Sequence, residues 1–333
     1  MTRKLNKQIF NLDHEYTADE RNRRHVIKQI YLTDSLSETY PQMLRATIST
    51  NNPDAIIKQE FNLFGFHGNA EDIYLSFPRL VAEADSLITK CKDYFDCGGE
   101  NICEIIVNVY NIAYPSEIEE ENDSDDALEI DQHVINAWAD MLTINIANII
   151  RKPNVINVFS AYSLGCGLLL RFMRSVELYD ITIVLILRSP FISIEEEINK
   201  GTLFTRTMAH LFFDKRIHDY FDMGEGLGGM KYTPDKTSIL MFNGTYDNIY
   251  NKSISKFLKL TKQHPIIKEY HLHVNHDDMI GNEASNDIAH VVFKEISKKH
   301  LVDQLDLLYS YTEEDATSDE EKDTANTQST DLF

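Results

Sequence analysis

The chain has 333 residues, of which 43% are hydrophobic, so it can bury one large core or two small ones and is not globally disordered. Its formal net charge of −21 argues against nucleic acid or an anionic membrane as a non-specific partner, because binding to phosphate groups needs a basic surface. Four cysteines and the lack of a secretory signal predict a reducing compartment, the cytoplasm.

The first 45 residues are polar and mixed in charge, and we expect residues 1–45 to form a segment packed on the core, with edge strands or a helix. No run in the chain approaches the ~18 apolar residues that a membrane-spanning helix needs. We therefore expect no transmembrane segment, and peripheral contact with a membrane stays open.

The first candidate site residues follow residues 61–66. This apolar run predicts a strand. Apolar residues at helical spacing begin at Ile73 and predict a helix. His67, Gly68 and Asn69 lie between the two elements. Gly68 permits a tight turn, and the main-chain N–H of Asn69, beside a helix N-terminus, suits a developing oxyanion.

A buried strand, an acidic insertion and another helix are predicted next. Residues 102–110 form the apolar strand, and residues 131–150 show helical spacing. Residues 117–126 are nearly all acidic and predict a flexible surface insertion. They lack the glycine of a calcium-binding loop, so we expect no calcium site there.

The following segment has the pattern of a nucleophile elbow. An apolar strand at residues 155–162 stops at Ser163, and residues 168–174 predict a helix directly after it. In such an elbow the serine has a strained backbone and its Oγ projects from the end of the sheet. Small residues two positions before and after the serine let strand and helix pass closely, and here they are Ala161 and Gly165.

Strands and helices continue to alternate in the C-terminal half. The predicted strand 238–242 leads to Asp247, and the predicted strand 268–274 leads to His276. The other predicted elements are a strand at 181–187, an aromatic-rich helical segment at 192–222, a flexible glycine-rich loop at 224–229, and helices at 253–263, 283–298 and 301–311. Residues 312–333 are acidic and polar and predict a disordered tail.

This alternation predicts an α/β fold with a mainly parallel, doubly wound sheet. In such sheets ligands bind beyond the carboxyl ends of the strands. Each chemical candidate lies at the end of a predicted strand: the segment from His67 to Asn69, Ser163, Asp247 and His276. We therefore expect these residues to meet at one edge of the sheet.

The three residue types suit nucleophilic catalysis, and their chain order is serine, acid, histidine. A serine hydroxyl needs a base within hydrogen-bond reach, and a carboxylate orients and stabilises the imidazole that serves as this base. Ser163 is thus the candidate nucleophile, Asp247 the acid and His276 the base. The main-chain N–H groups of Leu164 and Asn69 are the candidate oxyanion donors.

Other residues could take these roles. His271 and His273 are alternative bases, although they lie within a predicted strand rather than beyond its end. Asp277 and Asp278 are alternative acids, but adjacency to His276 gives poor geometry for supporting its ring. Cys166 is an alternative nucleophile that we expect to point away from the elbow into the core.

We expect no cofactor and no metal ion. Cys91, Cys97 and Cys103 are evenly spaced, but their spacing fits no zinc-binding pattern and no histidine lies nearby to complete a site.

Five short motifs make the chain similar to the α/β-hydrolase superfamily of serine hydrolases, over residues 58–300. They most resemble the branch with a His-Gly-Asn oxyanion segment, which contains acyl-protein thioesterases that act as depalmitoylases. The motifs are Phe66-His67-Gly68-Asn69-Ala70, Tyr162-Ser163-Leu164-Gly165, Ser189-Pro190-Phe191, Asn243-Gly244-Thr245-Tyr246-Asp247 and His276-Asp277-Asp278.

The resemblance implies an α/β-hydrolase domain at residues 46–311, with a mostly parallel sheet of about eight strands flanked by helices. It also implies the nucleophile, acid, base and oxyanion donors given above. In this resemblance His67, Gly68, Tyr162 and Gly165 support the elbow and the oxyanion segment. The chain departs from the family in Ala161, in its acidic insertion and tail, and in having no cysteine before Cys91.

We therefore expect a serine hydrolase, of the carboxylesterase or acyl-thioesterase type, that cleaves a small-molecule or acylated substrate through an acyl-enzyme. The apolar and aromatic residues within 203–223 would overhang the site and favour an acyl group. The alternative is a hydrolase-like scaffold of weak or no activity whose acidic insertion and tail bind a protein partner.

Overall fold

The computed structural model describes residues 31–32, 43–50, 55, 57–68, 71–95, 103–114, 132–193 and 222–297. The chain divides into two units, Met1–Val292 and Phe293–Phe333, and only residues 293–297 of the second are described. The predicted acidic insertion, the acidic tail, the helix at 301–311 and most of the aromatic-rich segment lie outside the described residues. The first unit contains the sheet and the candidate site.

An eight-stranded sheet forms the centre of the first unit, with the order β1-β2-β4-β3-β5-β7-β9-β10. β1 pairs with β2 and β2 with β4 in antiparallel fashion, and the remaining neighbours are parallel. The strands are β1 (Tyr31–Leu32), β2 (Met43–Ser49), β3 (Ile57–Phe66), β4 (Cys103–Ile112), β5 (Val155–Tyr162), β7 (Ile183–Arg188), β9 (Thr237–Gly244) and β10 (Ile267–Leu272). The mostly parallel α/β sheet predicted from the sequence is confirmed.

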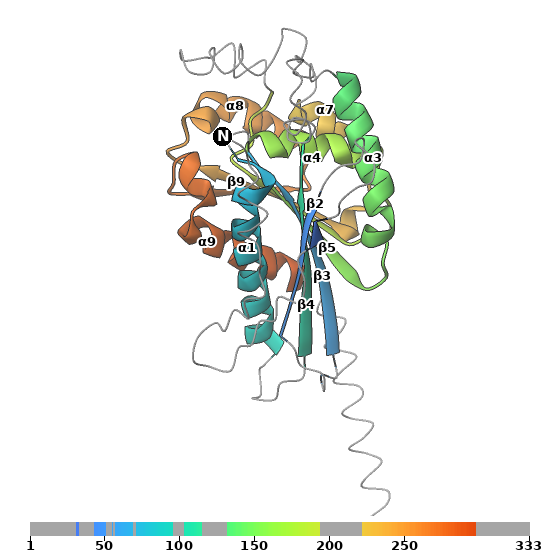
Figure 1. Cartoon of the computed structure of the whole chain (residues 1–333). Coiled ribbons are helices and arrows are strands. Elements are labelled where there is room, and N and C mark those ends of the chain that lie inside the picture. Colours follow the sequence, from blue (N-terminus) through green and yellow to red (C-terminus); the bar gives the residue numbers. More distant parts are fainter. Residues whose placement is uncertain are drawn as a thin grey trace, which may run out of the picture. The chain divides into compact units, whose positions relative to one another are not determined.

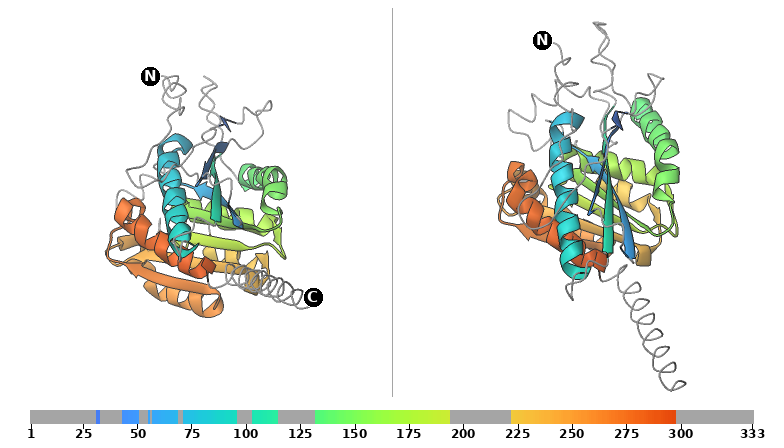
Figure 2. Two further views of the ribbon diagram at one scale, coloured as in Figure 1. Left: turned by 90° about the horizontal axis from the view of Figure 1, so that it is seen from below. Right: turned by 60° about the horizontal axis from the view of Figure 1, so that its bottom comes forward.

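Helices cover both faces of this sheet (Figures 1 and 2). Side chains on one face, such as Phe64 and Phe159, join a core with residues of α3, α4, α7 and α8. Their neighbours along the strands, such as Leu63 and Val158, face α1 and α9 instead, because successive side chains of a strand alternate between its faces. The helices are α1 (Ile73–Phe95), α3 (Gln132–Ile150), α4 (Leu164–Ser175), α7 (Met223–Gly228), α8 (Asn248–Gln263) and α9 (Asn282–Ile296).

The register of the parallel strands brings their carboxyl ends to one edge. Phe66 of β3 pairs with Ala161 of β5, and Tyr162 of β5 pairs with Arg188 of β7, which pairs with Phe242 of β9. The segments that follow β3, β5, β9 and β10 therefore start from the same edge, as the sequence predicted.

The prediction of a flexible loop at 224–229 is wrong, because α7 extends from Met223 to Gly228. Asp222 caps this short helix by accepting the main-chain N–H of Glu225 at 2.8 Å. Met223 and Leu227 are buried, and α7 packs against α4. Burial of these two side chains and the cap together outweigh the low helix propensity of glycine.

The sequence offered edge strands or a helix within residues 1–45, and β2 runs across the expected boundary between residues 45 and 46. Two short strands, β6 (Glu177–Leu178) and β8 (Lys231–Tyr232), also form a separate parallel pair that the sequence did not indicate. Short 3-10 helices complete the described elements: η3 (Pro234–Lys236) and η4 (Asp277–Ile280).

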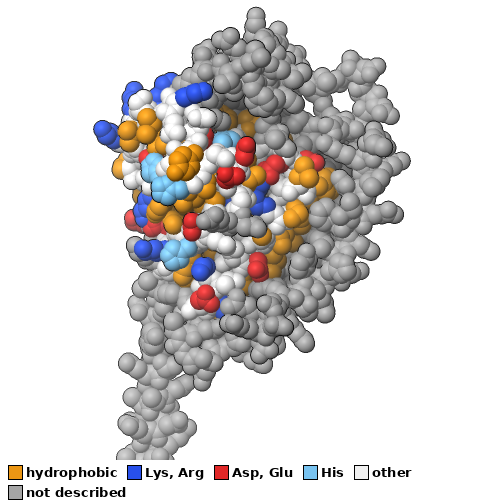
Figure 3. All heavy atoms as spheres, turned by 90° about the vertical axis from the view of Figure 1, so that its left-hand side faces the viewer, with side chains coloured by type: hydrophobic (Ala, Val, Ile, Leu, Met, Phe, Trp, Pro, Cys, Tyr) orange, Lys and Arg blue, Asp and Glu red, His pale blue; other side chains and the backbone are white. Residues whose placement is uncertain are grey.

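Among the described helices, none has the length and apolar character needed to cross a membrane. On the face shown in Figure 3, the visible lysine and arginine side chains lie among acidic, histidine and hydrophobic ones.

Candidate active site

Three side chains from separate loops meet at the carboxyl edge of the sheet. Ser163 lies between β5 and α4, Asp247 follows β9, and His276 follows β10. The Oγ of Ser163 lies 3.1 Å from Nε2 of His276, and Nδ1 of His276 lies 2.8 Å from Oδ2 of Asp247. The structure thus brings together the predicted nucleophile, base and acid in hydrogen-bond contact.

The backbone of Ser163 has the strained conformation expected of an elbow. Its φ is 50° and its ψ is −117°, a region that residues other than glycine rarely adopt. The N–H of Ser163 donates to the carbonyl oxygen of Arg188 at 2.9 Å, which ties the turn to β7. A Cβ on Gly165 would lie 2.3 Å from the carbonyl oxygen of Phe66, so only glycine permits this approach of α4 to the end of β3.

Asp247 is held in place for contact with the imidazole. It is 1% exposed, and its Oδ1 accepts the main-chain N–H of Tyr250 at 3.3 Å at the start of α8. The histidine side chain is 21% exposed, so the acid is buried while the base reaches the surface. With Asp247 accepting a hydrogen bond from Nδ1–H, the Nε2 atom of a neutral ring is left to accept the hydroxyl proton of Ser163.

The alternative residues lie elsewhere. His271 has its Nε2 3.7 Å from a carboxylate oxygen of Glu269, and His273 contacts the hydroxyl of Thr245 at 3.3 Å through Nδ1. Asp277 and Asp278 are exposed and belong to η4, so the buried Asp247 is the carboxylate that supports the ring.

Cys166 is also removed from the site. It is 1% exposed within α4, and its Sγ donates to the carbonyl oxygen of Arg188 at 3.6 Å. Burial raises the pKa of its thiol far above the ordinary value, so the nucleophilic thiolate is disfavoured. The expectation of a core cysteine is confirmed.

The segment after β3 packs directly against the elbow. A Cβ on Gly68 would lie 2.7 Å from the ring of Tyr162 and 3.8 Å from Cβ of Ser163. His67 is buried, its Nδ1–H donates to the carbonyl oxygen of Gly68 at 2.9 Å, and its own carbonyl accepts the hydroxyl of Tyr114 at 2.6 Å. His67 and Gly68 therefore shape the turn that leads to the predicted oxyanion donor.

Of the two predicted oxyanion donors, Leu164 is described and Asn69 lies outside the described residues. Leu164 is the first residue of α4. The first N–H groups of a helix have no acceptor within the helix, and they carry its positive dipole end. The N–H of Leu164 thus comes directly after the strained serine, at a helix N-terminus, where an anion would be stabilised.

Two sets of contacts around the elbow had no signal in the sequence. The hydroxyl of Tyr162 donates to the carbonyl oxygen of His276 at 3.2 Å. Glu71 accepts the N–H of Gly68 at 3.3 Å and forms an ion pair with Arg79 of α1. Tyr162 and His276 are far apart in the chain, so the sequence could not pair them. Gly68, Glu71 and Arg79 are near one another in the chain, but they follow no pattern that indicates their contacts.

Within the described part of the chain, histidine, cysteine and acidic side chains form no group of three or more that could hold a metal ion.

No family model and no curated protein sequence matches this chain. Solved structures do: a double variant of the esterase rPPE has a TM-score of 0.50 at 13% identity, covering 86% of each chain. A thermostable esterase from Pseudomonas putida has a TM-score of 0.49 at 12% identity, also covering 86% of each. An esterase from Pyrococcus furiosus has a TM-score of 0.47 at 10% identity, covering 83% of this chain and 91% of the other. At 13% identity the match with a TM-score of 0.50 shows a shared fold alone.

Proposed function

We propose that this chain, which has the α/β-hydrolase fold, is a serine hydrolase that cleaves an ester or thioester through an acyl-enzyme intermediate. One observation carries the proposal: the two hydrogen bonds, 3.1 and 2.8 Å long, that join Ser163 to His276 and His276 to Asp247. Such an arrangement of hydroxyl, imidazole and buried carboxylate is the one that activates a serine for attack on a carbonyl carbon.

In the first step the hydroxyl oxygen of Ser163 attacks the acyl carbon, and Nε2 of His276 takes the hydroxyl proton. Asp247 stabilises the resulting imidazolium through the bond from Nδ1–H. The imidazolium then protonates the leaving alcohol or thiol, and the acyl group stays on Ser163. Water, deprotonated by the same imidazole, releases the acid in the second step.

The negative charge on the carbonyl oxygen needs donors in both steps. We assign this role to the N–H groups of Leu164, which follows the nucleophile, and of Asn69, which follows Gly68 in the chain. Support comes from the position of Leu164 at the start of α4 and from the packing of Gly68 against Ser163 and Tyr162. The loss of one such donor costs about 3 kcal/mol of transition-state stabilisation.

We further propose an acyl substrate, as an ester or a thioester, in the cytoplasm. Both classes pass through the same tetrahedral oxyanion and the same acyl-enzyme. The apolar and aromatic content of residues 203–223 supports an acyl group rather than a peptide.

A fluorophosphonate probe tests the proposal, because it reacts covalently with activated serines. The wild-type protein is expected to label, and Ser163→Ala to lose all labelling while remaining folded. Ser175→Ala, an exposed serine at the end of α4, is the matched control and is expected to label like the wild type. Folded wild-type protein that does not label would refute the proposal and favour the alternative of an inactive scaffold.

Hydrolysis of p-nitrophenyl esters of increasing chain length, and of matching thioesters, then defines the substrate class. A rise of kcat/KM with chain length supports an acyl pocket. Equal rates for acetate and long-chain esters would contradict this finer assignment without affecting the serine mechanism.

A further inference from the structure

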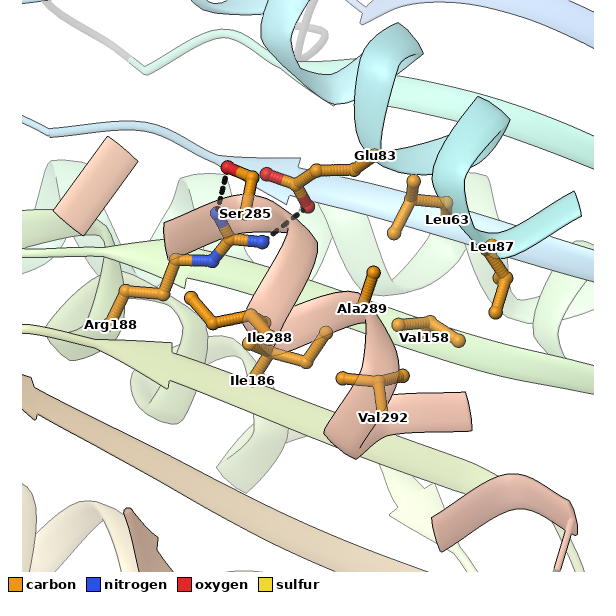
Figure 4. A pocket seen from close by; sticks show the side chains of 10 residues that line it. All are labelled: Leu63, Glu83, Leu87, Val158, Ile186, Arg188, Ser285, Ile288, Ala289 and Val292. Carbon is orange, nitrogen blue, oxygen red and sulfur yellow. Dashed lines mark hydrogen bonds and ion pairs between the residues drawn. The ribbon is translucent and has the colours of Figure 1, made fainter. Parts of the chain in front are cut away.

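A pair of opposite charges lies buried behind the elbow, on the side of the sheet that faces α1 and α9 (Figure 4). Arg188, the last residue of β7, is 2% exposed, and its Nη2 lies 2.8 Å from Oε2 of Glu83 on α1. Its Nη1 donates to the hydroxyl of Ser285 on α9 at 3.4 Å. The two charged groups lie at one end of a cavity of about 20 Å³ whose other lining residues are mainly apolar.

This pair joins three elements that build the candidate site. The same oxygen of Glu83 accepts the hydroxyl of Ser160 at 2.9 Å, and Ser160 lies on β5 just before the nucleophile. The main-chain oxygen of Arg188 accepts the N–H of Ser163. Glu83 itself belongs to the helix that starts after the oxyanion segment. The buried carboxylate of Glu83 thus links α1 to β5 and β7 close to the elbow.

A second pair continues this connection to the oxyanion segment. Arg79 lies one turn before Glu83 on α1, pairs with Glu71 and lies over the ring of Tyr162 at 5.9 Å. Glu71 in turn accepts the N–H of Gly68. Arg79, Glu83 and Arg188 line one small cavity of about 10 Å³. Acidic and basic groups therefore alternate from the oxyanion segment to the end of β7.

The Glu83–Arg188 pair is poorly suited to stabilising the fold. Both charges have left water, which lowers the pKa of Arg188 because burial disfavours its charged form, although Glu83 opposes the shift. Among the described residues, Nε of Arg188 has no hydrogen-bond partner. An apolar pair of similar volume would stabilise the fold equally or better, because the attraction within a buried pair seldom exceeds the desolvation cost. Such a replacement would remove the links that Glu83 makes from α1 to Ser160 of β5 and to Arg188 of β7.

We propose that Glu83 and Arg188 are positioning residues, which fix His67 and Gly68 of the oxyanion segment relative to Ser163. Arg188 sets the elbow through its main-chain oxygen, and its side chain sets the place of α1 through Glu83. His67 and Gly68 come shortly before that helix in the chain, so the position of α1 helps to set their distance from Ser163. This inference deepens the proposed function and rests on it.

The double variant Glu83→Leu/Arg188→Met tests the inference, because it replaces the pair by apolar side chains of similar volume. We expect a melting temperature within a few degrees of the wild type, because the desolvation cost of the ion pair disappears while the buried hydroxyls of Ser160 and Ser285 lose these partners. The rate constant of labelling by the fluorophosphonate should fall about 10- to 100-fold, since small displacements of reacting groups have effects of this size. With an ester substrate kcat should fall and KM should change little.

The control is Lys58→Met/Glu104→Leu. Lys58 and Glu104 form a 2.6 Å ion pair at the amino-terminal ends of β3 and β4, away from the carboxyl edge of the sheet, with the side chain of Glu104 9% exposed and that of Lys58 66% exposed. This control should label at the wild-type rate. If Glu83→Leu/Arg188→Met folds and also labels at the wild-type rate, the positioning role is overturned while the serine hydrolase proposal stands. If the wild type itself does not label, both proposals fail.

If the double variant does not fold, a milder variant tests the positioning role. Ser160→Ala removes only the hydroxyl that joins β5 to Glu83. We expect it to fold, and to label severalfold more slowly than the wild type with an unchanged KM. A wild-type labelling rate in folded Ser160→Ala would overturn the positioning role.

Discussion

The hydroxyl of Tyr162 donates a hydrogen bond to the main-chain carbonyl oxygen of His276 at 3.2 Å, so the residue before the candidate nucleophile holds the loop of the candidate base. The two rings also lie 5.4 Å apart. Burial raises the pKa of Tyr162, and nearby acidic groups, Asp277 first among them, add to the rise. The phenol therefore stays protonated and able to donate throughout the neutral range.

Tyr162→Phe should lower kcat about fivefold, because a neutral hydrogen bond contributes about 1 kcal/mol and here it fixes the position of the imidazole. The ring that packs on Gly68 remains, so the melting temperature should change by only a few degrees. Steady-state kinetics and thermal unfolding measure the two effects. An unchanged kcat would show that the loop of His276 is held by other contacts.

Asp247→Asn should lower kcat about 10⁴-fold with the fold retained. The amide can donate to Nδ1 of His276 instead of accepting from it, which leaves the proton on Nε2 and removes the base. Asp278→Asn, an exposed acid of η4, is the control and should keep the wild-type rate. A large loss in the control with little loss in Asp247→Asn would reassign the acid.

Cys166 should resist alkylation in the native protein at pH 8. Its pKa is raised by burial, so the thiol stays neutral at that pH and the reactive thiolate is scarce. Iodoacetamide followed by peptide mass analysis measures the modification, with denatured protein as the positive control. Cys166→Ala should label with the fluorophosphonate at the wild-type rate. Loss of labelling in folded Cys166→Ala would indicate that Cys166 is the nucleophile.

The parts of the fold that the sequence predicts are those where local pattern and burial agree. The run from Val155 to Tyr162 is buried throughout and mainly apolar, which identified β5 and the turn after it. The same reasoning placed Asp247 and His276 beyond their strands, and parallel topology then brought them to one edge. The contacts of His276 with Ser163 and with Asp247 follow from register, which is a property of the sheet as a whole.

Features that depend on tertiary contacts were not predictable. The helix α7 forms around Gly224 and Gly226 because Asp222 caps it and α4 covers Leu227. The ion pair between Glu83 and Arg188 links two residues from different elements, each of which looks ordinary in its own segment. Single-sequence patterns carry no information about such partners, because the pairing exists only once the sheet and α1 have come together.

Gly165→Ala should both destabilise the protein and reduce labelling by the fluorophosphonate. Its Cβ would lie 2.3 and 2.6 Å from the carbonyl oxygens of Phe66 and His67, which are backbone atoms, so α4 and the oxyanion segment must move apart. Gly228→Ala is the matched control, because its Cβ would meet nothing within 4 Å, and the change should stabilise α7 by about 0.5–1 kcal/mol. Thermal unfolding and labelling rates measure both variants. A Gly165→Ala protein that is as stable and as reactive as the wild type would show that strand β3 and the elbow do not need their close approach.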